Sequence, residues 1–155
     1  MRDRRSGFTL FELLTTIVLI GIILAFSYPK LQGIARTASL RGARGAMITA
    51  VNVAKTSAIA AGKCSYLKIT SSAVTVYTTP CTGGTQITVV SDRNFSTDYG
   101  VSVTLSKGGG SAQTTDSLGF DPRGIPVNTA QSADFVLTKS GSSYTVTVGN
   151  YGRVQ

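Results

Sequence analysis

The chain has 155 residues, with 15 Lys and Arg against 7 Asp and Glu, and it has no histidine. This length allows one long helix and one small domain, and the formal charge of +8 favours acidic partners such as nucleic acid or anionic lipid. The lack of histidine excludes His-based metal sites and catalytic triads, and the glycines at 108–110 lack the Lys-Ser/Thr of a phosphate-binding loop. We therefore expect no enzyme, no metal and no cofactor.

A long apolar helix is predicted directly after a basic leader of residues 1–7. From Phe8 to Tyr28 there are 21 residues, and Glu12 is the only charged one. About 20 apolar residues span the hydrocarbon core of a bilayer as a helix. A carboxylate inside such a segment costs about 2.5–3.5 kcal/mol on insertion scales, so Glu12 is a candidate functional residue.

Three interpretations of this stretch compete. It could be an ordinary N-terminal anchor. It could be a secretory signal peptide, although the apolar region of such a signal is shorter, about 7–15 residues, and no convincing cleavage site follows Ile23. In the third interpretation, the run GFTLFE at residues 7–12 closely resembles the class III signal of type IV prepilins and type II secretion pseudopilins. This resemblance covers roughly the first 30 residues.

The prepilin resemblance implies a processing step and an assembly role. In that family a prepilin peptidase cuts after the glycine, here between Gly7 and Phe8, and the new N-terminal Phe8 is N-methylated. Glu12 would pair with the N-terminal amine of a neighbouring subunit and set the axial register of a filament, because an unpaired charge in an apolar surround is strongly unfavourable. Pro29 fits the family's helix kink just past the membrane segment; alternatively, it marks simply the end of a membrane helix.

The helical pattern continues over residues 30–61. Glycines within this segment, among them Gly42, each weaken a helix by about 1 kcal/mol relative to alanine, and Gly62 is the expected helix end. Apolar residues recur at intervals of three, four or seven and form one stripe. The stripe comprises Leu40, Met47, Val51, Ala54 and Ala58.

Positive charge does not determine the orientation of the apolar stretch. The leader has three arginines, and the distal flank has Lys30, Arg36, Arg41 and Arg44. The positive-inside rule therefore leaves both orientations open. Outward placement of the C-terminal part depends on the cysteine pair and on the prepilin resemblance.

Cys64 and Cys81 are the two cysteines of the chain and enclose a 16-residue loop. Outside the cytoplasm we expect this pair to be oxidised. A disulfide with this loop length contributes about 3 kcal/mol in the chain-entropy model. The alternative is two buried free thiols.

Residues 62–155 have the Thr-, Ser-, Val-, Tyr- and Gly-rich composition of strands and turns. Residues 64–70 and 74–78, joined by residues 71–73, are predicted to form a hairpin. The last two strands are predicted to be joined by a turn at residues 141–143. Further strands are predicted at residues 86–91, 101–106, 117–120, 135–139 and 144–149.

Shorter segments resemble the GspH/FimT group of minor pilins and pseudopilins. Residues 53–60 are similar to the end of that group's helix, residues 120–124 to its Phe-x-x-x-Gly segment, and residues 152–155 to its C-terminal Gly-Arg-x-Arg tail. The resemblance implies an α+β pilin fold, in which a long N-terminal helix, transmembrane in its N-terminal half, packs on an antiparallel β-sheet domain. The expected organisation is a cleaved leader (1–7), a transmembrane and filament-core helix (8–29), an amphipathic continuation (30–61) and an exported globular domain (62–155).

The main functional hypothesis is a minor pilin or pseudopilin that initiates or caps a type IV pilus or a type II secretion pseudopilus. Its expected partners are the prepilin peptidase, other pilin subunits, the inner-membrane assembly platform and, before assembly, membrane lipid. We expect a single-pass protein of the bacterial inner membrane with a periplasmic C-terminal domain, which then moves into the pilus or to the cell surface. A major pilin, and an anchored domain that never polymerises, remain alternatives.

A second hypothesis is a DNA-binding minor pilin for DNA uptake in natural transformation. In FimT-like minor pilins the Gly-Arg-x-Arg tail binds DNA; Arg153 matches its first arginine, whereas Gln155 replaces the second. Arginine binds phosphate through a bidentate fork, and an aromatic ring can stack on a base. The alternative is a solvated basic surface. The candidate nucleic-acid-binding residues are Arg153, Lys139, Arg123 and Tyr151.

Overall fold

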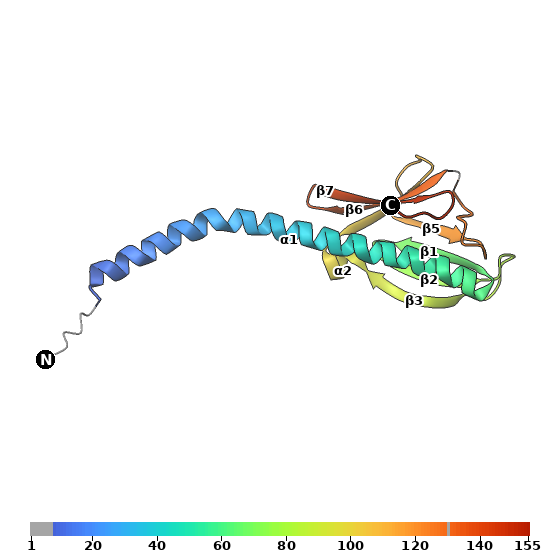
Figure 1. The fold of residues 1–155 in the computed structure, drawn as a ribbon, viewed down its shortest axis with the longest axis horizontal. Coiled ribbons are helices and arrows are strands. Elements are labelled where there is room, and N and C mark those ends of the chain that lie inside the picture. The colour runs from blue at the N-terminus through green and yellow to red at the C-terminus, as the bar shows by residue number, and fades with distance from the viewer. Residues whose placement is uncertain (1–7, 130) are drawn as a thin grey trace. The chain divides into compact units, whose positions relative to one another are not determined.

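A computed structural model describes residues 8–129 and 131–155, so the predicted leader, with Gly7, lies outside the described residues; the side chains of residues 27–29, 31 and 91 are not described either. The chain divides into two units, Met1–Thr37 and Ala38–Gln155, and each is treated by itself. Figure 1 shows the elements. They are α1 (Leu10–Ala61), β1 (Cys64–Thr70), β2 (Ala73–Thr79), β3 (Ile87–Asn94), α2 (Phe95–Tyr99), β4 (Ser102–Lys107), β5 (Thr115–Phe120), β6 (Ser132–Lys139) and β7 (Ser142–Gly149).

Local hydrogen bonds define both ends of α1. At its start, the Thr9 hydroxyl oxygen accepts a hydrogen bond from the Glu12 N–H at 3.2 Å. Thr9 and Glu12 have the Thr-x-x-Glu spacing of a capping box. At its end, Gly62 has a φ of +60°, and the Lys63 N–H donates to the Ala58 carbonyl oxygen at 3.3 Å. This is the glycine-terminated helix end that the sequence predicted, and the prediction is confirmed.

The predicted apolar stripe of the second half of α1 is buried. Its five residues belong to one core cluster together with side chains from both groups of strands, such as Leu67 of β1 and Phe135 of β6. In Figure 1, β2 and β3 lie on one side of this part of the helix, and β6 and β7 lie on the other. The stripe residues, each at most 2 % exposed, are Leu40, Met47, Val51, Ala54 and Ala58.

Gly42 has a packing role that offsets its low helix propensity. A Cβ atom at this position would lie 3.2 Å from the ring of Tyr99. Tyr99 ends α2, and its ring lies 5.7 Å from that of the fully buried Phe95. The glycine therefore lets the Tyr99 ring approach the backbone of α1 closely.

The strands form two antiparallel sheets, whereas the sequence predicted one sheet domain without strand order. One sheet has the order β3-β2-β1-β5, and the other has the order β4-β6-β7. The protein is thus α+β, with a helix packed on antiparallel strands, which is consistent with a pilin fold. Strand order was beyond the sequence because pairing depends on residues far apart in the chain.

Both hairpin turns are present, and each is one residue shorter than predicted. Ser71 and Ser72 form the first turn with φ of 47° and 73°, and Ser140 and Gly141 form the second with 48° and 82°. Two positive φ values are typical of the two-residue turn whose twist matches that of paired strands. The predicted connections at 71–73 and 141–143 were wrong in length, because Ser-Ser and Ser-Gly lack the usual Asn-Gly signal.

No sequence pattern predicted the short helix α2. Asn94 caps it, since its side-chain oxygen accepts hydrogen bonds from the N–H groups of Ser96 (3.0 Å) and Thr97 (3.4 Å). Gly100 ends it with a φ of 64°. The pair Asn94 and Gly100 was the available signal, but a five-residue helix is too short for an apolar period.

Ser72 joins the two sheets. Its hydroxyl oxygen accepts a buried hydrogen bond from the Val103 N–H of β4 at 3.1 Å, and its carbonyl oxygen accepts one from the Phe95 N–H at 2.9 Å. Buried polar groups are normally paired in this way. The β1–β2 turn is therefore also a contact between the sheets.

The predicted pairing of Cys64 with Cys81 is present as a disulfide. It joins the start of β1 to the loop that follows β2. Cys64 is buried, whereas Cys81 is exposed. The bond therefore holds the exposed end of this loop against the buried base of the sheet.

The double variant Cys64→Ser/Cys81→Ser should lower the free energy of unfolding by about 3 kcal/mol, because the open loop gains conformational entropy in the unfolded chain. Urea unfolding of the full chain in detergent, followed by tyrosine fluorescence, measures the loss. Chemical reduction of the unmodified chain should give the same loss. An unchanged urea midpoint in both samples would contradict the stabilising role of the disulfide.

Candidate functional site

Large apolar side chains of residues 8–26, here called the apolar segment, are exposed in the N-terminal unit. The exposed fractions run from 51 % at Ile22 to 83 % at Leu10. Such a contiguous apolar surface is unfavourable in water and marks a protein or membrane contact. Within the part of the chain that the structure describes, no helix combines the length and the apolar character needed to cross a membrane.

Glu12 lies in the first turn of α1, within the apolar segment. Its side chain is exposed, and none of the ion pairs found among the described residues includes it. Unpaired backbone N–H groups give the start of a helix a partial positive charge, which favours a carboxylate there. The carboxylate is also only four residues from Phe8, where a new amine would arise if the leader were cut off.

Pro29 lies inside α1, which continues to Ala61. The helix therefore continues past Pro29, and whether its membrane part ends there stays a prediction. The Pro29 side chain is not among those described, so the kink remains a prediction.

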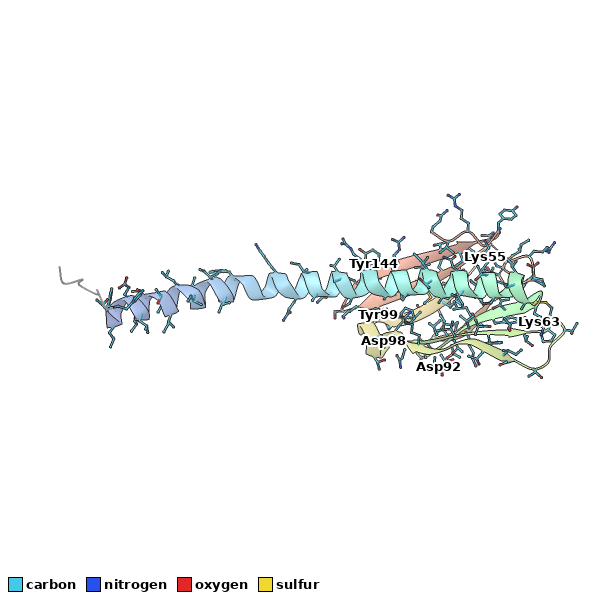
Figure 2. The ribbon with its side chains drawn as sticks, turned by 60° about the horizontal axis from the view of Figure 1, so that its bottom comes forward. Lys55, Lys63, Asp92, Asp98, Tyr99 and Tyr144 are labelled. Carbon is cyan, nitrogen blue, oxygen red and sulfur yellow. A yellow bond between two sulfur atoms is a disulfide. The ribbon has the colours of Figure 1, made fainter. Side chains whose placement is uncertain are left out.

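The end of α1, the loop after β5 and the C-terminal tail meet at one point. Gly152 is buried with a φ of 68°, and a Cβ atom there would lie 2.6 Å from the carbonyl oxygen of Gly124. A Cβ atom at Gly124 would in turn lie 3.0 Å from side-chain atoms of Lys55 and Ile59. Lys55, labelled in Figure 2, donates from its Nζ to the Gly152 carbonyl oxygen at 3.2 Å.

The tail runs back beside β7. The Gly149 N–H donates to the Arg153 carbonyl oxygen at 2.9 Å, and Thr147 and Gln155 exchange two backbone hydrogen bonds of 3.1 and 2.9 Å. The Arg153 side chain is exposed, and that of Tyr151 is 86 % exposed. The backbone is thus held in place while these two side chains are accessible to a partner.

The structure separates the four candidate DNA-binding residues. Arg123 lies in the loop that packs on the tail, next to Gly124. Lys139 pairs with Ser142 at the other end of β7, and its Nζ donates to the Tyr99 carbonyl oxygen at 2.6 Å. At about 3.3 Å per residue, the length of β7 puts about 23 Å between Lys139 and the tail. Arg123, Tyr151 and Arg153 therefore lie near one end of β7, whereas Lys139 lies near the other.

Asp121 holds the loop that carries Gly124. Its carboxylate accepts hydrogen bonds of 2.9 Å from the backbone N–H groups of Arg123 and Ile125 and from the Arg123 Nε. Burial by itself raises the pKa of Asp121, but these hydrogen bonds and the Arg123 charge outweigh it, so the pKa lies below its ordinary value. Arg123 is thus already paired with a carboxylate, for which any external anion must compete.

A small hollow between α1 and strands β2 and β3 has a mostly apolar lining, with Thr49 and Arg93 as its polar members. This lining provides no pair of acid and base. Among the described side chains, no group of three or more His, Cys, Asp or Glu is placed to hold a metal.

Residues 2–28 match the protein family described as "Prokaryotic N-terminal methylation motif". The match supports a type IV pilin-like or pseudopilin subunit. It implies processing by a prepilin peptidase and assembly with other pilins, and this family is a structural one rather than a family of enzymes. The match does not reach the globular unit or the tail. No curated protein and no solved structure matches the chain.

The variant Gly152→Ala should lower the free energy of unfolding by about 2 kcal/mol, because the added Cβ meets a backbone oxygen at a residue with positive φ. Gly149→Ala is the matched control: a Cβ there would lie 3.8 Å from the nearest atom, an ordinary contact. Gly149→Ala should change the free energy of unfolding by no more than about 0.5 kcal/mol. Urea unfolding of the full chain in detergent compares the two. Equal stabilities would show that the tail is not packed as described.

Proposed function

We propose that the chain is a minor pilin or pseudopilin, a structural subunit of a type IV pilus or a type II secretion pseudopilus. The observation that carries this proposal is the coincidence of two features. The methylation motif covers residues 2–28, and residues 8–26 within it present large apolar side chains that the described chain does not cover. A bilayer before assembly, and neighbouring subunits afterwards, would cover them.

In this proposal the prepilin peptidase cuts between Gly7 and Phe8, and Phe8 is then N-methylated. The membrane stage rests on the motif and on the sequence of residues 8–28, in which Glu12 is the only charged residue. Its length matches the about 20 residues that span a hydrocarbon core. The subunit waits in the bacterial inner membrane with its globular unit, which contains the proposed exported domain of residues 62–155, in the periplasm. The inner-membrane assembly platform then moves it into the filament.

Glu12 sets the axial register between subunits. After cleavage the Phe8 amine is a cation next to an apolar surface. Pairing with Glu12 of a neighbouring subunit neutralises both charges where water is excluded. The predicted kink at Pro29 adjusts the direction of the helix beyond this packed segment. A position at the start or tip of the filament rests on the resemblance to the GspH/FimT group.

Glu12→Gln should reduce incorporation into filaments at least about tenfold, because breaking a buried ion pair leaves one charge unpaired. The measurement is the fraction of the variant in sheared filaments relative to the membrane fraction. Thr16→Ala, also in the apolar segment, is the control and should be incorporated normally. If Glu12→Gln subunits enter filaments like the unmodified chain, the register role is wrong.

DNA binding is the second candidate function, and the accessibility of Tyr151 and Arg153 favours it. Both side chains extend from a tail whose backbone is held against β7, so little conformational entropy is lost when a partner binds. The Arg123 side chain, 78 % exposed, lies in the adjacent loop. Against this candidate, Gln155 supplies no charge where the resembling tails have an arginine.

Arg153→Ala should weaken binding of a short DNA duplex by about fivefold. It should also reduce the slope of log affinity against log salt concentration by about one, the value for one lost phosphate contact. The measurement is a fluorescence titration of the full chain in detergent at two salt concentrations. Lys139→Ala, at the other end of β7, is the control and should have little effect. If the unmodified chain does not bind duplex at low salt, the DNA function is excluded.

A further inference from the structure

The sequence has no acidic residue between Glu12 and Asp92. Four of the seven cations in this interval follow directly after the apolar segment, and we call residues 30–44 the basic segment. It contains Lys30, Arg36, Arg41 and Arg44. The remaining three cations of the interval are Lys55, Lys63 and Lys68.

The acids of the globular unit are already engaged with other groups. Lys30 and Arg41 have exposed side chains and take part in none of these contacts. Within the described residues, no carboxylate therefore neutralises these two cations. The contacts of the acids are Asp92 with Thr75, Asp98 with Arg93 at 3.9 Å, Asp116 with Lys107 at 2.7 Å, Asp121 with Arg123 at 2.9 Å and Asp134 with Thr147 at 2.6 Å.

The position of the basic segment along α1 indicates which external anion it meets. At 1.5 Å per residue, Lys30 lies about 6 Å beyond Phe26 along the helix, and Arg36 lies about 15 Å beyond it. The polar headgroup layer on each side of a bilayer is about 5–8 Å thick. With the apolar segment in the hydrocarbon core, Lys30 lies among the headgroups. Arg36 lies about one Debye length of 8 Å outside them.

We infer that the start of the basic segment, Lys30 with Arg36 beyond it, binds the phosphate headgroups of anionic phospholipids on the C-terminal side of the apolar segment. This inference rests on the proposed function, since the apolar segment must first enter the bilayer. Each cation near such a surface contributes an about fivefold preference for the anionic lipid. A lipid phosphate is favoured over a nucleic-acid phosphate because the apolar segment brings it next to Lys30. The contact holds the waiting subunit until assembly withdraws it.

A single tryptophan tests the inference, since the natural chain has none. The variant Phe26→Trp places one at the edge of the hydrocarbon core, four residues before Lys30, at a residue that is 75 % exposed. The full chain is reconstituted in vesicles of equimolar phosphatidylcholine and phosphatidylglycerol, in which either one lipid or the other carries bromine on its acyl chains. Brominated phosphatidylglycerol should quench the tryptophan severalfold more than brominated phosphatidylcholine does, and high salt should reduce the difference.

Adding Lys30→Gln, which removes the cation placed among the headgroups, should bring the two quenching values closer together. Lys68→Gln removes an exposed cation of β1 outside the basic segment and should leave the difference unchanged. Equal quenching by both lipids without these changes would overturn the lipid contact while leaving membrane insertion intact. Absence of quenching, together with failure to float with the vesicles, would instead overturn the membrane stage of the proposed function. Loss of the preference on adding duplex DNA would assign the basic segment to nucleic acid.

Discussion

The second half of α1 must bury one apolar stripe, and the globular unit depends on this requirement. The stripe from Leu40 to Ala58 packs against side chains of both sheets, which have separate hydrogen-bond ladders. Ser72 adds a buried polar contact between the sheets, and Gly42 lets Tyr99 pack against the helix. The apolar segment has no comparable partner among the described residues. One continuous helix thus has an apolar stripe that the sheets bury and an apolar segment that only other molecules could cover.

Contacts at the end of the same helix explain why the tail has a glycine at residue 152. Gly152 is needed because the carbonyl oxygen of Gly124 leaves no room for a side chain, and Lys55 ties the tail to α1. These contacts are structural, and any partner that binds Arg153 or Tyr151 relies on them. Gly152 therefore has a packing explanation, whereas the exposed Arg153 has none among the residues that the structure describes.

The charged residues are unevenly distributed along the chain: one acid lies in the apolar segment, cations follow it, and the other acids of the described residues lie in the globular unit. Glu12 is the one acid of the apolar segment and lies at the positively polarised start of α1, near the amine that cleavage would create. Beyond the apolar segment come the cations of residues 30–44, while the later acids are engaged within the globular unit. In the proposed function, assembly would exchange lipid contacts of the helix for contacts with neighbouring subunits, and charges at both ends of the apolar segment would affect when a subunit leaves the membrane.

Features that depend on local pattern could be predicted from the sequence: the methylation signal, the apolar stripe, the end of α1 at Gly62, the pairing of the two cysteines and the approximate positions of the strands. Composition and periodicity act over a few turns or alternating residues, so they can be read from one chain. Tertiary structure alone decided that the strands form two sheets, that Lys55, Gly124 and Gly152 meet, and that Lys139 lies a strand's length away from Arg153. The short helix α2 and the two-residue turns also depended on the packing around them. These features arise from contacts between residues far apart in sequence, and no local propensity encodes them.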